Sequence, residues 1–346
     1  MSKKIAVLGT GANGSCAAAD LIRNGYDVVL IDQWPAHVEA MRTGGLRIEM
    51  PAEVVELGDL RAFHLCDVAT FRDRFDIVML MTKAYDARWM AELIKPYLAP
   101  DGLLIGAQNA MTAEDLADIV GRDRTLGCVV ELSSEMFTPG IVKRNTPPER
   151  TWFALGALDA PMRRRLAEVE EIFSHIGRVS IADDIVSAKW MKLIVNSMTM
   201  AVRAMTAMTA GEIAQIPGSR EFMLRAGEEA LAAGQASGYG IVPIFGLSTK
   251  EVEGSNRVLE TLMDKLRSDV GPNTRNAMYQ DIVKGRRTEI DMLNGQVVEL
   301  GRRHGLATPV NEVLVDINLR ISRGELRQDP ANLERAMAAL AQRGVA

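Results

Sequence analysis

The feature that most constrains this chain is the glycine-rich run GTGANG at residues 9–14, which directly follows a short apolar run near the start. Residues 5–9, IAVLG, are short, apolar and end in glycine, as is typical of a strand buried in a parallel sheet. A helical pattern follows over residues 15–23, and DVVLID at 27–32 predicts a second strand. Together these segments predict a βαβ unit whose first turn is rich in glycine.

The three glycines of this turn have the spacing G-x-G-x-x-G, at Gly9, Gly11 and Gly14. Such glycines permit a tight turn, close approach of the backbone to a pyrophosphate, and close packing of the helix. The context of strand, turn and helix gives the pattern specificity, although a glycine-rich turn of another α/β protein remains the alternative. We therefore predict a Rossmann-type dinucleotide site whose loop contacts come from Gly9, Thr10, Gly11, Ala12, Asn13 and Gly14.

Asp32 bears on the choice of cofactor. It ends the second strand, 32 − 14 = 18 residues after the last glycine, where a carboxylate can bind ribose hydroxyls. A carboxylate there would repel a 2′-phosphate, and no Lys or Arg follows until Arg42. This favours NAD, with NADP still possible. The alternative is that Asp32 caps the turn that follows it.

Further apolar runs predict more buried strands, at residues 77–81, 103–106 and 125–132. Helical patterns lie between them. Strands that alternate with helices predict a doubly wound parallel sheet with helices on both faces.

Two later runs, 140–145 and 151–156, are joined through a Pro-Pro turn and predict a hairpin that extends the same sheet. A helix near 161–176 and a strand at 178–182 complete the α/β domain, which we place at residues 1–182.

The remainder of the chain, residues 183–346, predicts an all-helical domain, because strand signals nearly vanish after Asp183-Asp184. Helical patterns cover residues 185–213, 219–238, 248–267, 289–304, 310–323 and 330–343.

Two polar residues follow strands of the first domain, Lys83 after 77–81 and Asn109 after 103–106. Doubly wound folds bind ligands at the carboxyl ends of their strands. Lys83 could therefore contact the cofactor, and Asn109 the nicotinamide ribose or a substrate. The alternatives are a solvated lysine and a turn asparagine.

The helical domain begins with WMKLIVNSMTMAV at 190–202, an apolar run that carries Lys192 and, one helical turn later, Asn196. A buried ammonium is costly unless it is paired, so either Lys192 reaches water along its own stem or it faces a site. As a general acid it could protonate a carbonyl oxygen during hydride transfer. Lys189 is a competing candidate.

Glu289 is the carboxylate that we predict to hold this ammonium in place. Its alternative role is in the first turn of the helical pattern 289–304, where a negative charge suits the helix dipole.

Composition excludes other classes of protein. The net charge of −5 gives no basic field for nucleic acid. No apolar run approaches about 18 residues, so we expect no membrane span. The three cysteines and four histidines show no metal-ligand spacing, and the lack of an export signal favours the cytoplasm.

Five segments, in order along the chain, resemble the ketopantoate reductase (2-dehydropantoate 2-reductase) family. They are GTGANGS at 9–15, MTKAYD at 81–86, QNAM at 108–111, WMKLIVN at 190–196 and MYQDIVKGRRTEIDMLNG at 278–295. The resemblance implies a Rossmann domain followed by a helical domain, and reduction of a 2-oxo acid to a 2-hydroxy acid with a nicotinamide cofactor. It implies Lys192 as general acid, Glu289 as its assistant, Asn196 as a substrate contact, and Lys83 and Asn109 as cofactor contacts.

The chain departs from the family pattern at three positions. Met200 and Ala277 stand where the family has a substrate-facing asparagine and serine, and Ala110 stands where it has glycine. Losing polar partners makes the substrate pocket less polar, which can shift selectivity by orders of magnitude. Ketopantoate itself is therefore uncertain as substrate. The carboxylate of a 2-oxo acid would be held by backbone amides and by Asn276 or Arg275.

Two other functions remain open at this level. One is an NAD-dependent D-2-hydroxy acid dehydrogenase, or another hydroxy acid or alcohol dehydrogenase, with a different substrate. The other is a non-enzymatic NAD-binding sensor. A small-molecule substrate and a possible homodimer are the partners that we expect.

Overall fold

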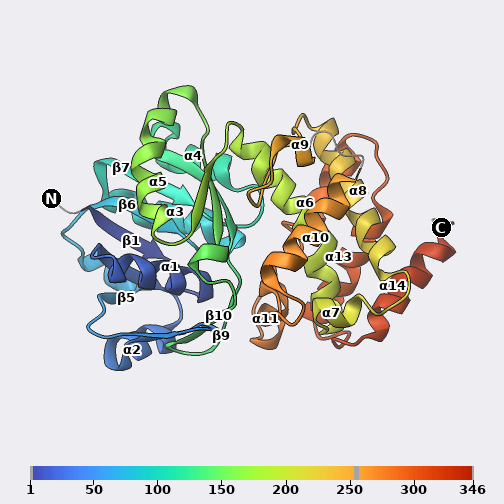
Figure 1. The fold of residues 1–346 in the computed structure, drawn as a ribbon, viewed down its shortest axis with the longest axis horizontal. Helices are drawn as coiled ribbons and strands as arrows, with labels where there is room; N and C mark the ends of the chain where they lie inside the picture. Colours follow the sequence, from blue (N-terminus) through green and yellow to red (C-terminus); the bar gives the residue numbers. More distant parts are fainter. Residues whose placement is uncertain (1–2, 253–256, 345–346) are drawn as a thin grey trace. The chain divides into compact units, whose positions relative to one another are not determined.

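The structure is a computed structural model that describes residues 3–252 and 257–344. Its internal contacts divide the chain into two compact units, Met1–Val186 and Ser187–Ala346 (Figure 1). The change from alternating strands and helices to helices alone, which we placed after residue 182, therefore lies close to the boundary between the two units.

The first unit is built on a sheet of eight strands in the order β12-β11-β8-β7-β6-β1-β2-β5. Every neighbouring pair is parallel except β8 and β11, which are antiparallel. The doubly wound fold and its buried strands are thus confirmed. The strands are β1 (Lys4–Leu8), β2 (Asp27–Asp32), β5 (Ala62–His64), β6 (Phe75–Leu80), β7 (Leu98–Gly106), β8 (Thr125–Glu131), β11 (Trp152–Ala157) and β12 (Arg178–Ile181).

Helices cover both faces of this sheet, because alternate residues of its strands are apolar on both sides. In β1, Ile5 and Val7 join the core that includes α1 and α5, whereas Ala6 and Leu8 join the core that includes α3 and α4. The helices of this unit are α1 (Ala12–Arg23), α2 (Pro35–Gly44), α3 (Ala87–Ile94), α4 (Ala113–Val120) and α5 (Leu166–Ser174).

A second sheet of four strands, in the order β4-β3-β10-β9, packs against α1. Its strands are β3 (Leu46–Glu49), β4 (Val54–Leu57), β9 (Ser134–Thr138) and β10 (Ile141–Arg144). The predicted hairpin of 140–145 with 151–156 is therefore wrong. The first of these segments, β10, pairs with β9 and β3, whereas the second, β11, pairs with β8 in the main sheet.

The reason is a contact that is distant in sequence. Arg144, at the end of β10, is fully buried and forms an ion pair with Asp20 of α1, 124 residues away, at 2.5 Å. The buried side chains of β10 face this helix, so α1 lies between two sheets. No local pattern encodes that arrangement.

The described residues of the second unit form helices joined by turns and loops, with no strand among them. Its helices are α6 (Ile185–Thr206), which begins at the end of the first unit, α7 (Ala210–Ile213), α8 (Ser219–Ala236), α9 (Thr249–Val252), α10 (Val258–Val270), α11 (Ala277–Val283), α12 (Asn294–Arg303), α13 (Pro309–Ser322) and α14 (Ala331–Gln342). The predicted helix 185–213 is interrupted after Thr206, because Ala207 has a φ of +58°. Part of the predicted helix 248–267, residues 253–256, lies outside the described residues.

Buried amide side chains hold α6 by its backbone. The amide of Asn294 donates to the carbonyl oxygen of Ser197 at 3.0 Å, that of Asn318 to Ala201 at 3.3 Å, and that of Asn332 to Met205 at 2.9 Å. These three asparagines are fully buried. Each hydrogen bond contributes about 1 kcal/mol, and together they fix how α6 is rotated about its own axis.

Candidate active site

The carboxyl ends of β1, β2, β6 and β7 lie together at one edge of the main sheet. The chain leaves β1 for β2 on one side and later returns to place β6 on the other side, so this edge is a topological switch point. Hydrogen bonds continue past the strand ends, from Gly9 N to Ile31 O and from Met81 N to Leu8 O, both at 2.8 Å. The structure thus brings the glycine loop, Asp32, Lys83 and Asn109 to the same edge, as the sequence predicts.

The three loop glycines have different steric roles. Gly9 has a φ of +94°, and a Cβ atom there would lie 2.8 Å from the backbone nitrogen of Thr82. A Cβ at Gly14 would lie 2.1 Å from the carbonyl oxygen of Gly9. A Cβ at Gly11, in contrast, would meet no atom within 4 Å. Close contacts within the protein require glycine at positions 9 and 14, whereas Gly11 has open space beside it.

That open space lies at the N-terminus of α1. Gly11 is the N-cap residue and provides no side-chain cap, so the first amides of the helix remain available to an acceptor. Such amides, with the helix dipole behind them, bind phosphate groups. The residues present therefore fit the pyrophosphate of a dinucleotide.

Two polar side chains around the loop are engaged by the protein. Asn13 accepts a hydrogen bond from the hydroxyl of Ser134 at 2.6 Å, so the side chain of Asn13 is held within the first unit. Asp32 is largely buried, accepts the N–H of Trp34 at 2.8 Å, and accepts the hydroxyl of Thr10 at 3.3 Å. Asp32 thus does cap its turn, the alternative role that the sequence allowed, and it also joins β2 to the glycine loop.

His37 is a contributor that sequence reasoning missed. It is fully buried on α2, and its Nδ1 accepts the N–H of Gly140 at 3.0 Å. A backbone N–H can only donate and a carbonyl can only accept, so Nε2 carries the proton and donates to the carbonyl oxygen of Thr10 at 2.8 Å. Ser15 donates to the same oxygen at 2.7 Å. By binding the carbonyl oxygen of Thr10, the side chains of His37 and Ser15 fix the conformation of the glycine loop.

The turn after β7 contains a strained residue. Gln108 is buried and donates to the carbonyl oxygen of Leu80 at 2.7 Å, which joins this turn to β6. Ala110 has a φ of +75°, in the left-handed region that favours glycine. Asn109 lies between these two residues, so its position is set by a hydrogen bond on one side and a constrained turn on the other.

In the helical unit, Lys192 is 8 % exposed and lies one turn before Asn196, which is 5 % exposed. The Nζ of Lys192 lies 4.8 Å from the centroid of the Phe245 ring, a cation–π contact. Phe245 is itself buried and has a φ of +61°, which is rare for an aromatic residue. Strained residues of this kind concentrate at functional sites. Lys189 is also buried.

Glu289 is 3 % exposed, but it does not lie in the first turn of a helix. That interpretation is wrong, since α12 begins at Asn294. The backbone of Glu289 instead closes a turn, because its carbonyl oxygen accepts the N–H groups of Met292 and Leu293, both at 3.0 Å. The hydrogen bond from Asn294 to Ser197 places this segment against α6, which also carries Lys192.

Three other predicted substrate residues lie further along α6 and beside it. Met200 is buried on α6, and its carbonyl oxygen accepts the amide of Asn276 at 3.0 Å. The side-chain oxygen of Asn276 accepts the N–H of Tyr279 at 2.8 Å and so caps α11, whose first residue is Ala277. The contacts of Asn276 within the chain favour a structural role for it.

Burial also controls the acidity of groups on α1. Burial raises the pKa of Cys16 to about 12. Burial likewise raises the pKa of Asp20, against the opposing effect of Arg144. The thiol nearest to the glycine loop is therefore protonated and unreactive at neutral pH.

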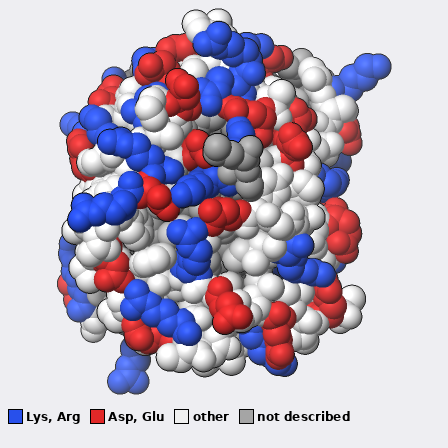
Figure 2. Space-filling model, turned by 90° about the vertical axis from the view of Figure 1, so that its left-hand side faces the viewer, with Lys and Arg blue, Asp and Glu red and all other residues white. Residues whose placement is uncertain are grey.

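Surface charge, metal-ligand groups and membrane spans also bear on the class of protein. Lys and Arg alternate with Asp and Glu on the face drawn in Figure 2, so this face carries no basic field. Among residues 3–252 and 257–344, no group of three His, Cys, Asp or Glu side chains could hold a metal ion. No helix in that same part of the chain is long and apolar enough to cross a membrane.

The doubly wound sheet and the glycine loop at its switch point define a dinucleotide-binding fold with a separate helical unit. Family models identify the class as an oxidoreductase that uses a nicotinamide cofactor. Residues 5–157 match the model described as ketopantoate reductase PanE/ApbA, and residues 184–320 match the model of its C-terminal part. The chain belongs to the ketopantoate reductase family, whose members are oxidoreductases that act on CH–OH groups with NAD(P).

Individual relatives are distant but cover almost the whole chain. The 2-dehydropantoate 2-reductase of Pyrococcus horikoshii is 27% identical over 312 residues, which are 90% of this chain and 95% of that protein. The crystal structure of a PanE/ApbA family ketopantoate reductase from Ralstonia eutropha JMP134 superposes with a TM-score of 0.76 and 26% identity, covering 93% of this chain and 99% of that one.

A second solved structure has the same fold at lower identity. It is a ternary structure of D-mandelate dehydrogenase with NADH and anilino(oxo)acetate, with a TM-score of 0.80 and 21% identity, covering 93% of this chain and 99% of that one. This likeness shows the fold alone.

Proposed function

We propose that this protein is an NAD-dependent enzyme that interconverts 2-oxo acids and 2-hydroxy acids, with Lys192 as general acid. The observation that carries the proposal is the placement of Lys192. Its ammonium is largely withdrawn from water, lies 4.8 Å from the Phe245 ring centroid, and shares a helix face with Asn196. A buried ammonium with a neighbouring amide suits a carbonyl oxygen that gains negative charge.

When bound, the dihydronicotinamide ring supplies a hydride to the carbonyl carbon of the substrate. The carbonyl oxygen then takes a proton from the Lys192 ammonium, so that the ketone becomes a secondary alcohol and Lys192 becomes a neutral amine. In the oxidative direction the amine accepts that proton. Glu289 orients the ammonium from the turn before α12, and Asn196 donates a hydrogen bond to the substrate.

The substrate side chain is less polar than that of ketopantoate. Met200 is a buried apolar side chain on the same face of α6 as Lys192 and Asn196, and Ala277 begins α11 with no polar group. A branched or aromatic 2-oxo acid would lose nothing at these positions, whereas a substrate hydroxyl would lack a partner.

NAD is the cofactor that the residues after β2 favour. Asp32 offers a carboxylate where NADP-dependent enzymes need a cation. The first cation after it, Arg42, pairs with Glu39 at 3.0 Å and with Asp67 at 2.6 Å, and also donates to the carbonyl oxygen of Ala62. Its guanidinium is therefore committed within the first unit. Lys83 and Asn109 complete the proposed cofactor contacts.

The test is a turnover assay with the purified protein. NADH and NADPH are each offered with a panel of branched, aromatic and acidic 2-oxo acids together with ketopantoate, and the loss of nicotinamide absorbance is followed. We expect NADH and an apolar 2-oxo acid to give the highest kcat/KM. Turnover of ketopantoate with NADPH above every other pair would contradict the proposal.

Light scattering in the same buffer tests the accompanying proposal that the protein is a homodimer.

A further inference from the structure

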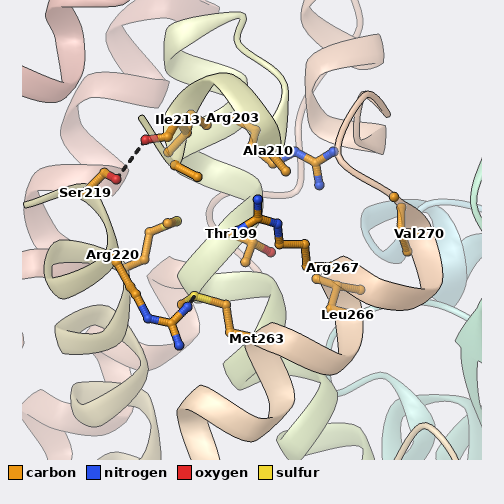
Figure 3. A pocket seen from close by; sticks show the side chains of 13 residues that line it. Thr199, Arg203, Ala210, Ile213, Ser219, Arg220, Met263, Leu266, Arg267 and Val270 are labelled. Carbon is orange, nitrogen blue, oxygen red and sulfur yellow. Dashed lines mark hydrogen bonds between the residues drawn. The ribbon is translucent and has the colours of Figure 1, made fainter. Parts of the chain in front are cut away.

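A pocket of about 160 Å³ lies within the helical unit, beside the later turns of α6. Residues of α6, α7, α8 and α10, and of the turns after α7 and α10, line it (Figure 3). For scale, an engineered cavity of about 150 Å³ in another protein binds benzene. This pocket therefore has room for a six-membered ring or a branched chain of similar size.

Most of the pocket wall is apolar. Its apolar side chains include Ile213 of α7, Met223 of α8, and Met263, Leu266 and Val270 of α10. Ligand pockets characteristically combine such walls with a few polar groups that fix orientation. The two methionines add adaptable surface, because their unbranched side chains can adjust to a ring.

The charged groups of this pocket are arginines. Arg203 of α6 is 7 % exposed, and it donates to the carbonyl oxygen of Thr274 and, at 3.1 Å, to the hydroxyl of the same residue. Arg267 lies in the last turn of α10, and its side chain points toward Thr199 in the pocket (Figure 3).

A third arginine, Arg220, is paired with Asp264 through two contacts, at 2.9 and 3.2 Å. No Asp or Glu is among the described residues that line the pocket. Its charged lining is therefore cationic. An organic anion would place its charge near Arg203 and Arg267, where guanidinium groups bind carboxylates in a bidentate manner.

The pocket is separate from the residues that we propose for catalysis. None of Lys192, Asn196, Met200 and Glu289 lines it. Along α6, Thr199 lies about 10 Å and Arg203 about 16 Å beyond Lys192, at about 1.5 Å per residue. The pocket therefore lies beside the later turns of α6, away from Lys192.

We propose that this pocket is a second binding site, for a small organic carboxylate with a ring-sized apolar body. The apolar body lies between α8 and α10, and the carboxylate faces Arg203 and Arg267. The site goes beyond the proposed function and does not depend on it.

The test uses benzoate, with benzamide as its neutral isostere. The protein is labelled with ¹³C at the methionine methyl groups, and Met223→Leu and Met263→Leu assign the two signals of interest. We expect saturable benzoate-dependent shifts of these two signals, while that of Met79, buried in the first unit, stays in place. Benzamide is expected to bind at least about tenfold more weakly. Equal binding of both probes, or shifts elsewhere alone, would overturn the proposal.

Two variants locate the site. Arg267→Gln should weaken benzoate about tenfold and leave turnover intact, because Arg267 is exposed and does not belong to the proposed catalytic residues. Ala214→Phe should fill the pocket and abolish the shifts. The matched control is Arg302→Gln, an exposed arginine of α12 that does not line the pocket. An effect of Arg302→Gln equal to that of Arg267→Gln would show a general charge effect and contradict the site.

Binding to Lys192→Ala separates this site from the catalytic residues without an activity assay. The second-site proposal requires unchanged benzoate shifts in that variant. If Lys192→Ala abolishes the shifts, the pocket belongs to the substrate site and the proposal fails. The proposed function would stand in that case, and it would fail separately if no 2-oxo acid were turned over.

Discussion

The glycine loop of the first unit and the Lys192 face of α6, made of Lys192, Asn196 and Met200, offer contrasting ways to build a functional surface. In the loop, the first amides of α1 remain available because the N-cap residue, Gly11, has no side chain. On α6 the backbone is an ordinary helix, and buried side chains are the groups that we propose for catalysis. Local geometry specifies the loop, whereas packing by distant segments specifies the helix face. Substitutions in the loop should therefore change stability or NADH binding, whereas substitutions on the Lys192 face should change kcat.

The largest effect is expected at Lys192. Lys192→Ala should lower kcat by about 10²–10⁴-fold, the usual contribution of a general acid, and leave the Kd for NADH unchanged. Lys192→Arg keeps the positive charge but cannot release a proton at neutral pH, so it should be almost as inactive. Stopped-flow turnover and fluorescence titration of NADH measure the two quantities. The control is Lys189→Ala. A greater loss of kcat in this control would assign the acid to Lys189 instead.

The loop should show a contrast between two of its glycines. Gly14→Ala places a Cβ atom 2.1 Å from the Gly9 carbonyl oxygen, so we expect a loss of about 1–3 kcal/mol of stability, as for other overpacked sites. Gly11→Ala meets no protein atom within 4 Å. It should keep the Tm and weaken NADH binding, because its methyl group takes the space left for the pyrophosphate. Equal changes in Tm for both variants would remove the distinction between them.

Phe245 offers a test of how the Lys192 ammonium is held. Phe245→Leu removes the ring face, and the loss of a desolvated cation–π contact of about 2 kcal/mol should lower kcat by roughly tenfold or more. Phe222→Leu, at a buried phenylalanine of α8, is the matched control for loss of core volume. The interpretation requires that the two variants have similar Tm values but different kcat values.

Substitution of His37 tests whether its buried side chain positions the glycine loop. His37→Ala removes the donor to the Thr10 carbonyl and the acceptor for the Gly140 N–H, each hydrogen bond contributing about 1 kcal/mol. We expect the KM for NADH to rise several-fold with kcat nearly constant, and His37→Gln to recover part of the loss. His64→Ala, at a histidine that contacts Glu39 at 2.7 Å, should leave KM unchanged. A fall in kcat without a change in KM would reject a positioning role.

The smallest effect concerns Ala110, which adopts a φ of +75°. Ala110→Gly should raise the free energy of unfolding by about 0.5–1 kcal/mol, because the left-handed conformation costs alanine more than glycine loses in chain entropy. Urea denaturation measures this change. Ala113→Gly, at the first residue of α4, should change stability in the opposite direction.

The sequence was a sound guide wherever a short segment determines its own structure. The strands of the main sheet are continuous apolar runs, and the glycine spacing sets the loop, so both were predictable. The four-stranded second sheet was not predicted, since β10 is stabilised by the contact of Arg144 with Asp20 on α1. Its strands are short and alternate in burial, which carries little signal without knowledge of the partner.

Among the candidate site residues, the placement of Lys192 and Asn196 on one helix face was the easier to predict. They are one turn apart on α6, and both are buried. Glu289 was placed in a helix that begins only at Asn294, because the apolar spacing continues through the preceding turn. His37 and Phe245 gave no signal, because their roles depend on the Thr10 carbonyl and the Lys192 ammonium, which lie far away in sequence.

The buried asparagines that bind the backbone of α6 affect how the substrate specificity of this enzyme could be redesigned. A helix turns by about 100° per residue, so a slip of one residue would carry Lys192 off its face. Asn294, Asn318 and Asn332 prevent that rotation through carbonyl oxygens, without using any side chain of α6. Met200 can therefore be exchanged for a smaller or a polar residue while Lys192, the proposed proton donor, stays in register, which makes this position a suitable first target for redesigning specificity.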